Sequence, residues 1–269
     1  MGSGIAQAAV QSGFFALLYD VNKPVLQKAQ EKIQSDLQHL VAKNKISEED
    51  RAAMLGRLQF VSSINDCIAD VIIEAIVEKT EVKTALLNQL AEVNHSETIL
   101  ASNTSSLSVT AIAEKVVHPE RVIGMHFFNP ATIMKLVEVV NTPFTNPDVT
   151  NSIVELSRKM GKTPVLCKDA PGFIVNHVAR PYYLEALKLV EQGISDFETI
   201  DNLLEATGFK MGPFRLMDLI GNDINYAVSC SVYEAMEKPA RLQPSPIQQQ
   251  KVETGALGRK TGKGYYQYN

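Results

Sequence analysis

Residues 1–22 read MGSGIAQAAVQSGFFALLYDVN, and the second half of this stretch has the pattern of a strand that closes on an acid, Asp20. In dinucleotide-binding units a glycine-rich turn follows the first strand, and an acid roughly 20 residues further on hydrogen-bonds the adenosine ribose. Gly2 and Gly4 stand at a suitable distance before Asp20. The stretch therefore predicts the second strand of such a unit, preceded by a short amphipathic helix over residues 3–12.

The same stretch lacks the strand that should precede the glycines, because only Met1 stands before Gly2. In the doubly wound order that strand lies in the middle of the sheet. Its loss would leave the ladder groups of both neighbours unpaired, and each buried unsatisfied group costs about 1–3 kcal/mol. We therefore expect the sequence to be a truncated copy that lacks roughly the first dozen residues of the natural chain. A genuine short form that binds the dinucleotide poorly or not at all is the alternative.

The composition is that of an ordinary globular protein, with 269 residues of which 45% are hydrophobic and 21% charged. A net charge of -4 gives no reason to expect nucleic acid or an anionic membrane as partner. No apolar stretch approaches the roughly 20 residues that span a bilayer. The cysteines are too few and too scattered for a disulfide framework or a metal site, which predicts a reducing, cytoplasmic location. They are Cys67, Cys167 and Cys230.

The first two thirds of the chain alternates helical and strand-like segments, which predicts an α/β fold with a Rossmann-type doubly wound parallel sheet. Helical spacing predicts a helix from Asn22 to about Lys45, with Asn22 as its N-cap, and another helix from Ser47. The predicted strands, of which the first two read as buried, are FFALLYD (14–20), DVIIEAIVE (70–78), TILASNTSS (98–106), RVIGMHFFNP (121–130), MKLVEVV (134–140) and TPVLCKD (163–169).

After Lys168 the alternation of strand-like and helical segments ends, and Pro171 and Gly172 mark a hinge. Beyond the hinge nearly every segment has helical spacing. We therefore predict a Rossmann-like domain over residues 1–168 and an all-helical domain over residues 173–269. The final residues are rich in glycine and lysine until the closing aromatic side chains, which we expect to anchor the tail.

Polar residues follow several of the predicted strands, where ligands bind in open α/β sheets. A histidine on one strand and a carboxylate twelve residues later meet if the two strands are neighbours, and the carboxylate then prepares the imidazole as a general base. Each residue also has a structural interpretation: a hydrogen-bonded core histidine, a solvent-facing glutamate on an edge strand, or a helix-capping serine. The residues concerned are Glu78, residues 103–106, His126, Asn129 and Glu138.

Four longer runs are far more specific than any single residue: SNTSSLSVTAIA, GMHFFNPATIMKLVEVV, CKDAPGFIVN and MGPFRLMDLIGND. Together they resemble the L-3-hydroxyacyl-CoA dehydrogenase family, including the 3-hydroxybutyryl-CoA dehydrogenases, over essentially the whole chain. VARPYYLEAL and LQPSPIQQQ in the second domain look most like the phenylacetate-pathway branch that oxidises 3-hydroxyadipyl-CoA. The resemblance implies NAD-dependent oxidation of an L-3-hydroxyacyl-CoA to the 3-oxoacyl-CoA by a homodimer, with the second domain serving substrate binding and dimerisation.

The family's roles transfer to matching positions of this sequence. His126 would be the catalytic base and Glu138 its partner, while Ser105 and Asn176 would hold the substrate oxygen and acyl chain. Lys43 would bind the coenzyme A phosphates. Gly2 would be the fingerprint glycine that allows close helix–strand packing, and Asp20 would favour NAD over NADP because its carboxylate repels a 2′-phosphate. The implied cofactor-binding set is Gly2, Asp20, Ala75, Glu78, Lys83, Ser105, Asn129 and Lys260.

Three departures from the family pattern fall in the second domain: Lys210 replaces a proline, Arg215 a glutamate, and His177 an arginine. Cationic Lys210 and Arg215 would suit an acyl chain that ends in a carboxylate, and plain surface variation is the alternative. Two other functions stay open. One is a catalytically idle structural or binding relative with a defective nucleotide loop, and the other is the dehydrogenase part of a larger β-oxidation enzyme.

Overall fold

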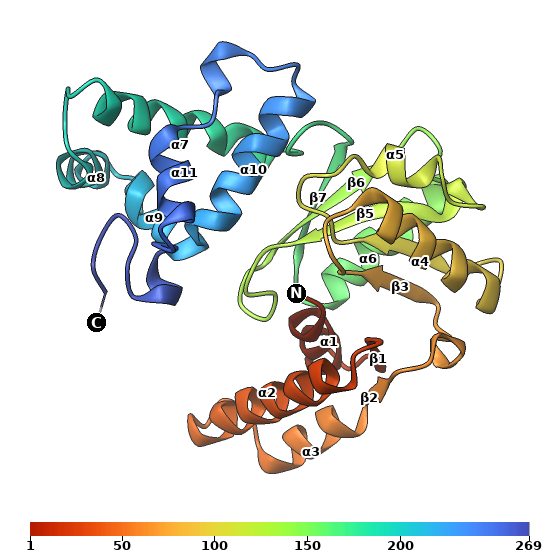
Figure 1. The fold of residues 1–269 in the computed structure, drawn as a ribbon. Helices are drawn as coiled ribbons and strands as arrows, with labels where there is room; N and C mark the ends of the chain where they lie inside the picture. The colour runs from red at the N-terminus through yellow and green to blue at the C-terminus, as the bar shows by residue number, and fades with distance from the viewer. Residues whose placement is uncertain (269) are drawn as a thin grey trace. The chain divides into compact units, whose positions relative to one another are not determined.

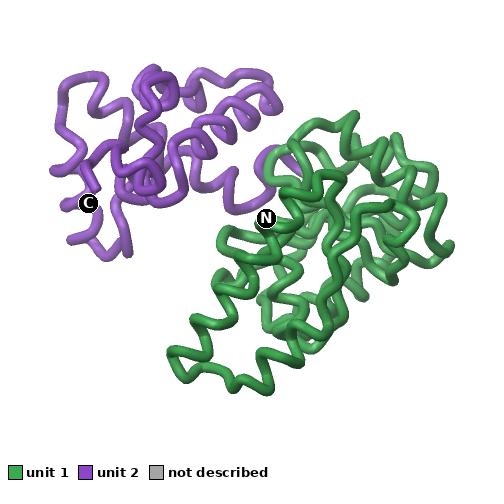
Figure 2. The backbone as a smooth tube through the Cα atoms, turned by 60° about the horizontal axis from the view of Figure 1, so that its bottom comes forward, with its two compact units in different colours: residues 1–169 green, residues 170–269 purple. Residues whose placement is uncertain are grey.

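The computed structural model describes residues 1–268 and divides the chain into two compact units. Figure 2 colours residues 1–169 green and residues 170–269 purple. Each unit has its own hydrophobic core, and each is described by itself below. Within residues 1–268 no helix is both long enough and apolar enough to cross a membrane.

The first unit alternates strands and helices in the order expected for an α/β fold (Figure 1). Its helices are α1 (Gly2–Gln11), α2 (Lys23–Ala42), α3 (Glu48–Gly56), α4 (Thr80–Val93), α5 (Val109–Ala113) and α6 (Pro147–Lys159), with short 3-10 turns at Ile64–Asp66 and Pro119–Arg121. Its strands are β1 (Ala16–Tyr19), β2 (Leu58–Val61), β3 (Val71–Glu74), β4 (Ile99–Ser102), β5 (Val122–Phe127), β6 (Leu136–Asn141) and β7 (Thr163–Lys168).

The strands form two sheets: β1 pairs with β2, and β3-β4-β5-β6-β7 form a five-stranded sheet. All pairs are parallel except β5 and β6, which run antiparallel. The sheet is therefore parallel, as expected, at every step but this one. Strands β5 and β6 are antiparallel because the connection between them is short. Residues 128–135 are too few for the crossover of about a dozen residues that a parallel pair requires.

Helix α1 packs against both sheets. Ile5 and Ala8 belong to the core cluster of the five-stranded sheet, whereas Ala6 and Val10 pack with α2 and β2 residues such as Leu37. Strand β1 stands at the edge of its two-stranded sheet, and β3 stands at the edge of the other. The prediction of two buried strands is accordingly wrong, because all of β1 and most of β3 are only partly buried.

Local sequence signals placed the helix starts correctly. Helix α2 begins directly after Asn22, whose side chain accepts a hydrogen bond from the backbone N–H of Val25 at 3.3 Å. Helix α3 begins after Ser47, which forms a reciprocal capping box with Asp50. Both helix starts confirm the predictions, since capping depends on neighbours in the sequence rather than on distant contacts.

Different helices pack on the two faces of the five-stranded sheet. Residues of α1 and α6 pack on the face that carries Met125 and Phe127. The opposite face meets α5, because a Cβ added at Gly124 would lie 2.9 Å from Val109 Cγ2. Side chains alternate between faces along a strand, so His126 lies on the same face as Gly124.

All regular elements in the described residues of the second unit are helices, as expected, and the tail adds isolated bridges between Gly258 and Lys263 and between Lys263 and Gln267. Its buried core packs aromatic and aliphatic side chains, including Tyr183, Phe214 and Met217. Its helices are α7 (Val175–Glu191), α8 (Phe197–Ala206), α9 (Pro213–Ile220), α10 (Asn222–Ala235) and α11 (Pro246–Glu253), with 3-10 turns at Ala240–Leu242 and Arg259–Thr261.

Two buried carboxylates anchor the tail to α9. Asp201 accepts hydrogen bonds from the backbone of Phe214 at 2.9 Å and from the hydroxyl of Tyr266 at 2.8 Å. Asp218 accepts from the backbone N–H of Tyr265 at 2.9 Å and from the hydroxyl of Tyr268 at 2.9 Å. The prediction that the closing aromatic residues hold the tail is confirmed, and the two acids are the partners that sequence patterns did not identify.

Candidate active site

The end of β5 and the start of β6 bring a histidine and a carboxylate together. His126 and Glu138 are directly opposed in the antiparallel register, and Nδ1 of His126 lies 2.8 Å from Oε2 of Glu138. Both residues are buried, with Glu138 fully so. The ring of Phe128 packs against the imidazole at a centroid distance of 4.5 Å. The solvent-facing interpretation of Glu138 is therefore wrong, and the pair has the arrangement of an oriented general base.

The residues after β4 link the ends of three neighbouring strands. The backbone N–H of Asn103 donates to the carbonyl oxygen of Glu74 on β3 at 2.8 Å. Its side-chain oxygen accepts from the backbone N–H of Phe127 on β5 at 2.8 Å. Asn103 thus ties the segment that leads to Ser105 to the strand that carries His126. Sequence analysis had placed residues 103–106 at this edge of the sheet without a role for Asn103.

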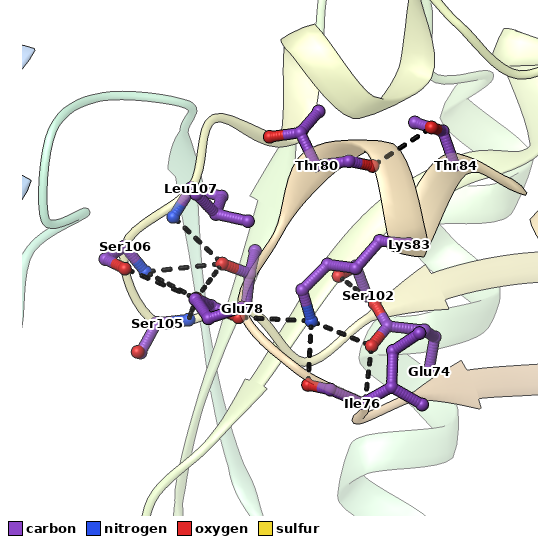
Figure 3. Close-up of polar contacts among 11 residues, drawn as sticks. Glu74, Ile76, Glu78, Thr80, Lys83, Thr84, Ser102, Ser105, Ser106 and Leu107 are labelled. Atoms are coloured by element: carbon purple, nitrogen blue, oxygen red, sulfur yellow. Dashed lines mark hydrogen bonds and ion pairs between the residues drawn. The ribbon is translucent and has the colours of Figure 1, made fainter. Parts of the chain in front are cut away.

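The Glu78 carboxylate accepts several hydrogen bonds from the loop after β4 (Figure 3). Its Oε1 accepts hydrogen bonds from the hydroxyl of Thr104 at 2.5 Å and from the backbone N–H groups of Ser105 and Ser106 at 2.9 and 3.3 Å. Burial alone would raise the pKa of Glu78, but the hydrogen bond from Thr104 and the charge of Lys83 outweigh burial and lower it. Glu78 is therefore held as a carboxylate that shapes the loop around Ser105.

Behind Glu78 lies a fully buried lysine (Figure 3). Nζ of Lys83 lies 2.7 Å from Oε1 of Glu74 and 3.1 Å from Oε2 of Glu78, and it donates to the carbonyl oxygen of Ile76 at 3.4 Å. An ammonium group has three donors, and these contacts engage all of them. Sequence analysis missed Glu74, because it took Glu78 as the acid at which this strand emerges, whereas β3 ends at Glu74.

The first residues of the chain offer features that suit a dinucleotide. Asp20 follows β1 and accepts a hydrogen bond from the backbone N–H of Asn22 at 2.8 Å. Helix α1 begins at Gly2 with no side-chain cap and no acid in its first turn, and the N-terminal N–H groups of a helix favour an anion. The close approach expected of Gly2 is absent, because an added Cβ would stand 3.7 Å from Leu18, an ordinary contact distance.

The remaining predicted site residues are spread over both units. In the first unit, Ala75 directly follows β3, and Asn129 lies exposed in the loop after β5, before a cis peptide bond to Pro130. Lys43 is exposed at the end of α2. Asn176 and Lys260 belong to the second unit, where Asn176 lies in the first turn of α7. Nζ of Lys260 pairs with Asp223 at 2.6 Å.

Of the three departures noted in the sequence, His177 and Arg215 have contacts inside the second unit, whereas Lys210 is exposed. His177 Nδ1 lies 3.0 Å from the carbonyl oxygen of Pro171. The Arg215 guanidinium pairs with Glu205 at 3.1 Å and lies over the ring of Tyr266. Among residues 1–268 no group of three or more histidine, cysteine, aspartate or glutamate side chains is placed to hold a metal ion.

The fold and the buried histidine–carboxylate pair define a dinucleotide-dependent oxidoreductase with a helical second unit. The family model described as "3-hydroxyacyl-CoA dehydrogenase, NAD binding domain" matches residues 1–170, and that described as "3-hydroxyacyl-CoA dehydrogenase, C-terminal domain" matches residues 172–268. The chain therefore belongs to the 3-hydroxyacyl-CoA dehydrogenase family, whose members are NAD-dependent oxidoreductases acting on CH–OH groups.

Individual relatives agree with this assignment. The chain is 47% identical over its whole length to the 3-hydroxyadipyl-CoA dehydrogenase of Escherichia coli, and it spans 57% of that protein. It is 39% identical to the mitochondrial hydroxyacyl-coenzyme A dehydrogenase of Sus scrofa and covers 88% of it. The solved structure of (S)-3-hydroxybutyryl-CoA dehydrogenase from Ralstonia eutropha is 35% identical, with a TM-score of 0.94; the match covers the whole of this chain and 95% of that one.

Proposed function

We propose that this chain oxidises the C3 hydroxyl of an L-3-hydroxyacyl-CoA to the 3-oxoacyl-CoA, with NAD as hydride acceptor. The observation that carries the proposal is the buried His126–Glu138 pair at 2.8 Å, at the end of a sheet in an NAD-binding domain. Oxidation of a secondary alcohol requires a base for the hydroxyl proton, and a positioned base contributes typically about 10²–10⁴-fold to the rate.

His126 acts as the base through Nε2. Glu138 accepts a hydrogen bond from Nδ1–H, which fixes the tautomer with the basic lone pair on Nε2. When Nε2 takes the proton from the C3 hydroxyl, the ring becomes an imidazolium, and the adjacent carboxylate stabilises that charge. Burial of the pair strengthens this interaction, since little water screens it.

The first unit has residues that fit NAD. Asp20 would bind the adenosine ribose and favour NAD over NADP, and the uncapped start of α1 at Gly2 would face the pyrophosphate. Ala75, Glu78 and Asn129 follow strands β3 and β5 and would line the nicotinamide side. Bound there, NAD supplies the hydride acceptor for the oxidation.

The substrate contacts are proposed from the family roles. Ser105 would hold the reacting oxygen, since Glu78 fixes the backbone of the loop that carries it. Asn176 would position the acyl chain, and exposed Lys43 would meet the coenzyme A phosphates. Lys260 would reach the cofactor only by exchanging its ion pair with Asp223. Relatives are named for 3-hydroxyadipyl-CoA and 3-hydroxybutyryl-CoA, and both are proposed as substrates.

NADH formation tests the proposal directly. Purified protein is assayed for NADH formation with NAD and either L-3-hydroxybutyryl-CoA or 3-hydroxyadipyl-CoA, and circular dichroism shows in parallel that it is folded. Turnover of either substrate supports the dehydrogenase, and the ratio of the two kcat/KM values ranks the acyl chains. A folded protein that binds NAD yet turns over neither substrate would point to the idle relative instead.

We also propose that the protein is a cytoplasmic homodimer. Leu219, Ile220 and Ile224 are exposed apolar side chains at the junction of α9 and α10, and monomers rarely expose contiguous apolar patches. The three cysteines are free thiols, which suits a reducing compartment. Light scattering after gel filtration should give twice the chain mass of 29.6 kDa. A single-chain mass at working concentration would contradict the dimer.

A further inference from the structure

Arg180 on α7 is buried in the second unit without an acid beside it. Only 2% of the residue is exposed, although arginine is almost never buried to this extent unless it is paired. Within residues 1–268 its guanidinium makes no ion pair and instead lies 4.9 Å from the ring centre of Tyr183. Burial lowers the pKa of Arg180 to about 10, so the guanidinium is still a cation near neutral pH. The described part of the chain therefore leaves a buried positive charge without a counter-charge.

The guanidinium uses only some of its donors inside the unit. Nε donates to the carbonyl oxygen of Asn176 at 3.0 Å. Nη1 donates to the carbonyl oxygen of Asn225 at 3.0 Å and to the hydroxyl of Ser229 at 2.9 Å. A guanidinium has five N–H donors, and the two on Nη2 have no acceptor among residues 1–268. Nη2 is not one of the buried polar atoms that lack a partner, so it keeps access to solvent and can donate to a ligand.

A second donor without an acceptor belongs to the same polar cluster, which consists of Arg180, Asn225, Ser229 and Gln248. The side-chain nitrogen of Asn225 is buried and has no hydrogen-bond partner among residues 1–268. Its side-chain oxygen is fixed, because it accepts from Nε2 of Gln248 at 2.7 Å. Buried polar groups are nearly always hydrogen-bonded, so a buried donor and a buried cation without partners indicate that an anion is missing from the cluster.

The cluster lies close to the residue that we propose to position the acyl chain. Arg180 follows Asn176 by four positions on α7, so the two lie on the same face of the helix, one turn or about 5.4 Å apart along its axis. In a 3-hydroxyadipyl group a few carbon–carbon bonds separate C3 from the terminal carboxylate, and in extended form they span a similar length. A carboxylate at the end of such a chain is therefore within reach of Arg180.

We propose that Arg180, with Asn225, binds the terminal carboxylate of a dicarboxylic acyl-CoA substrate and so determines the acyl-chain specificity. This inference rests on the proposed function for its kinetic consequence, but acyl-CoA binding can be measured without turnover. The planar guanidinium suits a carboxylate, because hydrogen bonds between charged groups are roughly twice as strong as neutral ones. A butyryl chain ends in a methyl group, offers no acceptor and leaves Arg180 without a counter-charge.

Adipyl-CoA and butyryl-CoA provide the binding test, because neither has a C3 hydroxyl to oxidise. Titration calorimetry should show that the wild type binds adipyl-CoA about tenfold or more tightly than butyryl-CoA, since a hydrogen bond to a charged group is worth about one to two factors of ten. Arg180→Met should remove most of this preference, and so should Asn225→Asp, which adds an acid to the cluster. Arg215→Met removes an equal charge from the same unit and should leave the preference unchanged.

The kinetic test separates recognition of the carboxylate from general damage to the helices. In Arg180→Met we expect kcat/KM for 3-hydroxyadipyl-CoA to fall about 10–100-fold more than kcat/KM for L-3-hydroxybutyryl-CoA, because only the former substrate carries the carboxylate. Arg180→Lys keeps the charge but not the planar fork, and it should recover part of the preference. If Arg180→Met does not fold, Asn225→Asp replaces it, since this change keeps the side-chain size and the oxygen that accepts from Gln248.

Each result decides for or against the role of Arg180. A wild-type preference for adipyl-CoA that the folded variants lose supports the proposal. Equal losses for the two acyl chains overturn it, because Arg180 would then only join α7 to α10, and a wild-type protein that binds both acyl-CoA molecules equally well also overturns it. A wild-type protein that is inactive on both hydroxyacyl-CoA substrates overturns the proposed function, and the binding comparison still decides the role of Arg180.

Discussion

His126 and Glu138 are direct cross-strand partners, with Nδ1 and Oε2 2.8 Å apart. They meet because β6 runs against β5, which brings the start of one strand beside the end of the other. In a parallel pair joined by a long crossover, residues twelve positions apart could not be opposed in this way. The short connection over residues 128–135 thus determines both the direction of β6 and the assembly of the His126–Glu138 pair.

Replacement of the base tests its role. His126→Gln should lower kcat/KM by about 10²–10⁴-fold while the fold is retained, because only the proton acceptor is removed. The matched control is His118→Gln: His118 also pairs with a glutamate, Glu120, at 3.3 Å, but on the surface. Steady-state NADH formation measures both variants. Equal losses in the two, or no loss in His126→Gln, would exclude His126 as the base.

The lowered pKa of Glu78 gives stability a pH dependence. Its carboxyl loses a proton more readily in the folded than in the unfolded chain, so its contribution is fully present above the unfolded pKa and is lost as pH falls through the folded pKa. Glu78→Gln should therefore destabilise the protein at pH 7, and the difference from wild type should shrink towards pH 4 and below. Denaturant unfolding at several pH values measures this, and a difference that does not vary with pH would contradict it. Glu92→Gln, exposed on α4, controls for the loss of one carboxylate.

The hydrogen bonds between Asp218 and the C-terminal residues leave no space for a side chain at Gly264. A Cβ added there would overlap the carboxylate of Asp218, which holds the backbone of Tyr265 and Tyr266. Gly264→Ala should lower the free energy of unfolding by about 1–3 kcal/mol, as overpacking of a buried site does. Gly56→Ala is the control, since a Cβ at that position would meet nothing within 4 Å. Equal thermal stability of the two variants would show that the tail adapts freely.

The contacts of Arg215 argue against a role for Arg215 in binding a substrate carboxylate. Its guanidinium pairs with Glu205 at 3.1 Å and lies 5.2 Å from the ring centre of Tyr266. We expect Arg215→Met to leave the preference between adipyl and butyryl chains unchanged and to cost about 0.2–1 kcal/mol, the worth of a partly exposed ion pair. The two kcat/KM values and a denaturation curve measure this. A selective loss of the adipyl substrate would restore the carboxylate-binding hypothesis, and Lys210→Met provides the comparison.

The local parts of this structure were predictable, and the direction of one strand was predictable but missed. The starts of α2 and α3 followed from Asn22 and from the Ser47–Asp50 box, because capping involves residues within one turn of each other. Strand β6 was recognised as a strand, but its antiparallel pairing with β5 follows from the length of the connecting loop. The burial of β1 was overestimated for a related reason, since an apolar run does not reveal that its strand stands at an edge.

The site shows the same division. His126 and Glu138 were predictable as residue types at strand ends, and the distance between them required the register. Glu74 was missed because DVIIEAIVE contains two acids, and only pairing with β4 shows that the strand ends at the first. The contacts of Lys83 could not be predicted from sequence, since the three groups that engage its donors converge only in the folded sheet.

Cys167 offers a readout of the charge on Glu138. Burial, the charge of Glu138 and the charge of Asp169 raise the pKa of this thiol from its ordinary value of 9.0 to about 11. Only the thiolate reacts with alkylating agents. Because the pKa of Cys167 is about two units higher, the thiol should be about a hundredfold less reactive than an ordinary thiol near neutral pH.

Glu138→Gln removes one of those charges, and the alkylation rate of Cys167 should rise because its pKa falls. Mass spectrometry of iodoacetamide-treated protein follows the Cys167 peptide, with Cys230 in the second unit as internal reference. Glu155→Gln, exposed on α6, removes an equal charge elsewhere and should leave the rate unchanged. An unchanged rate in folded Glu138→Gln would contradict the prediction that the charge of Glu138 raises the pKa of Cys167.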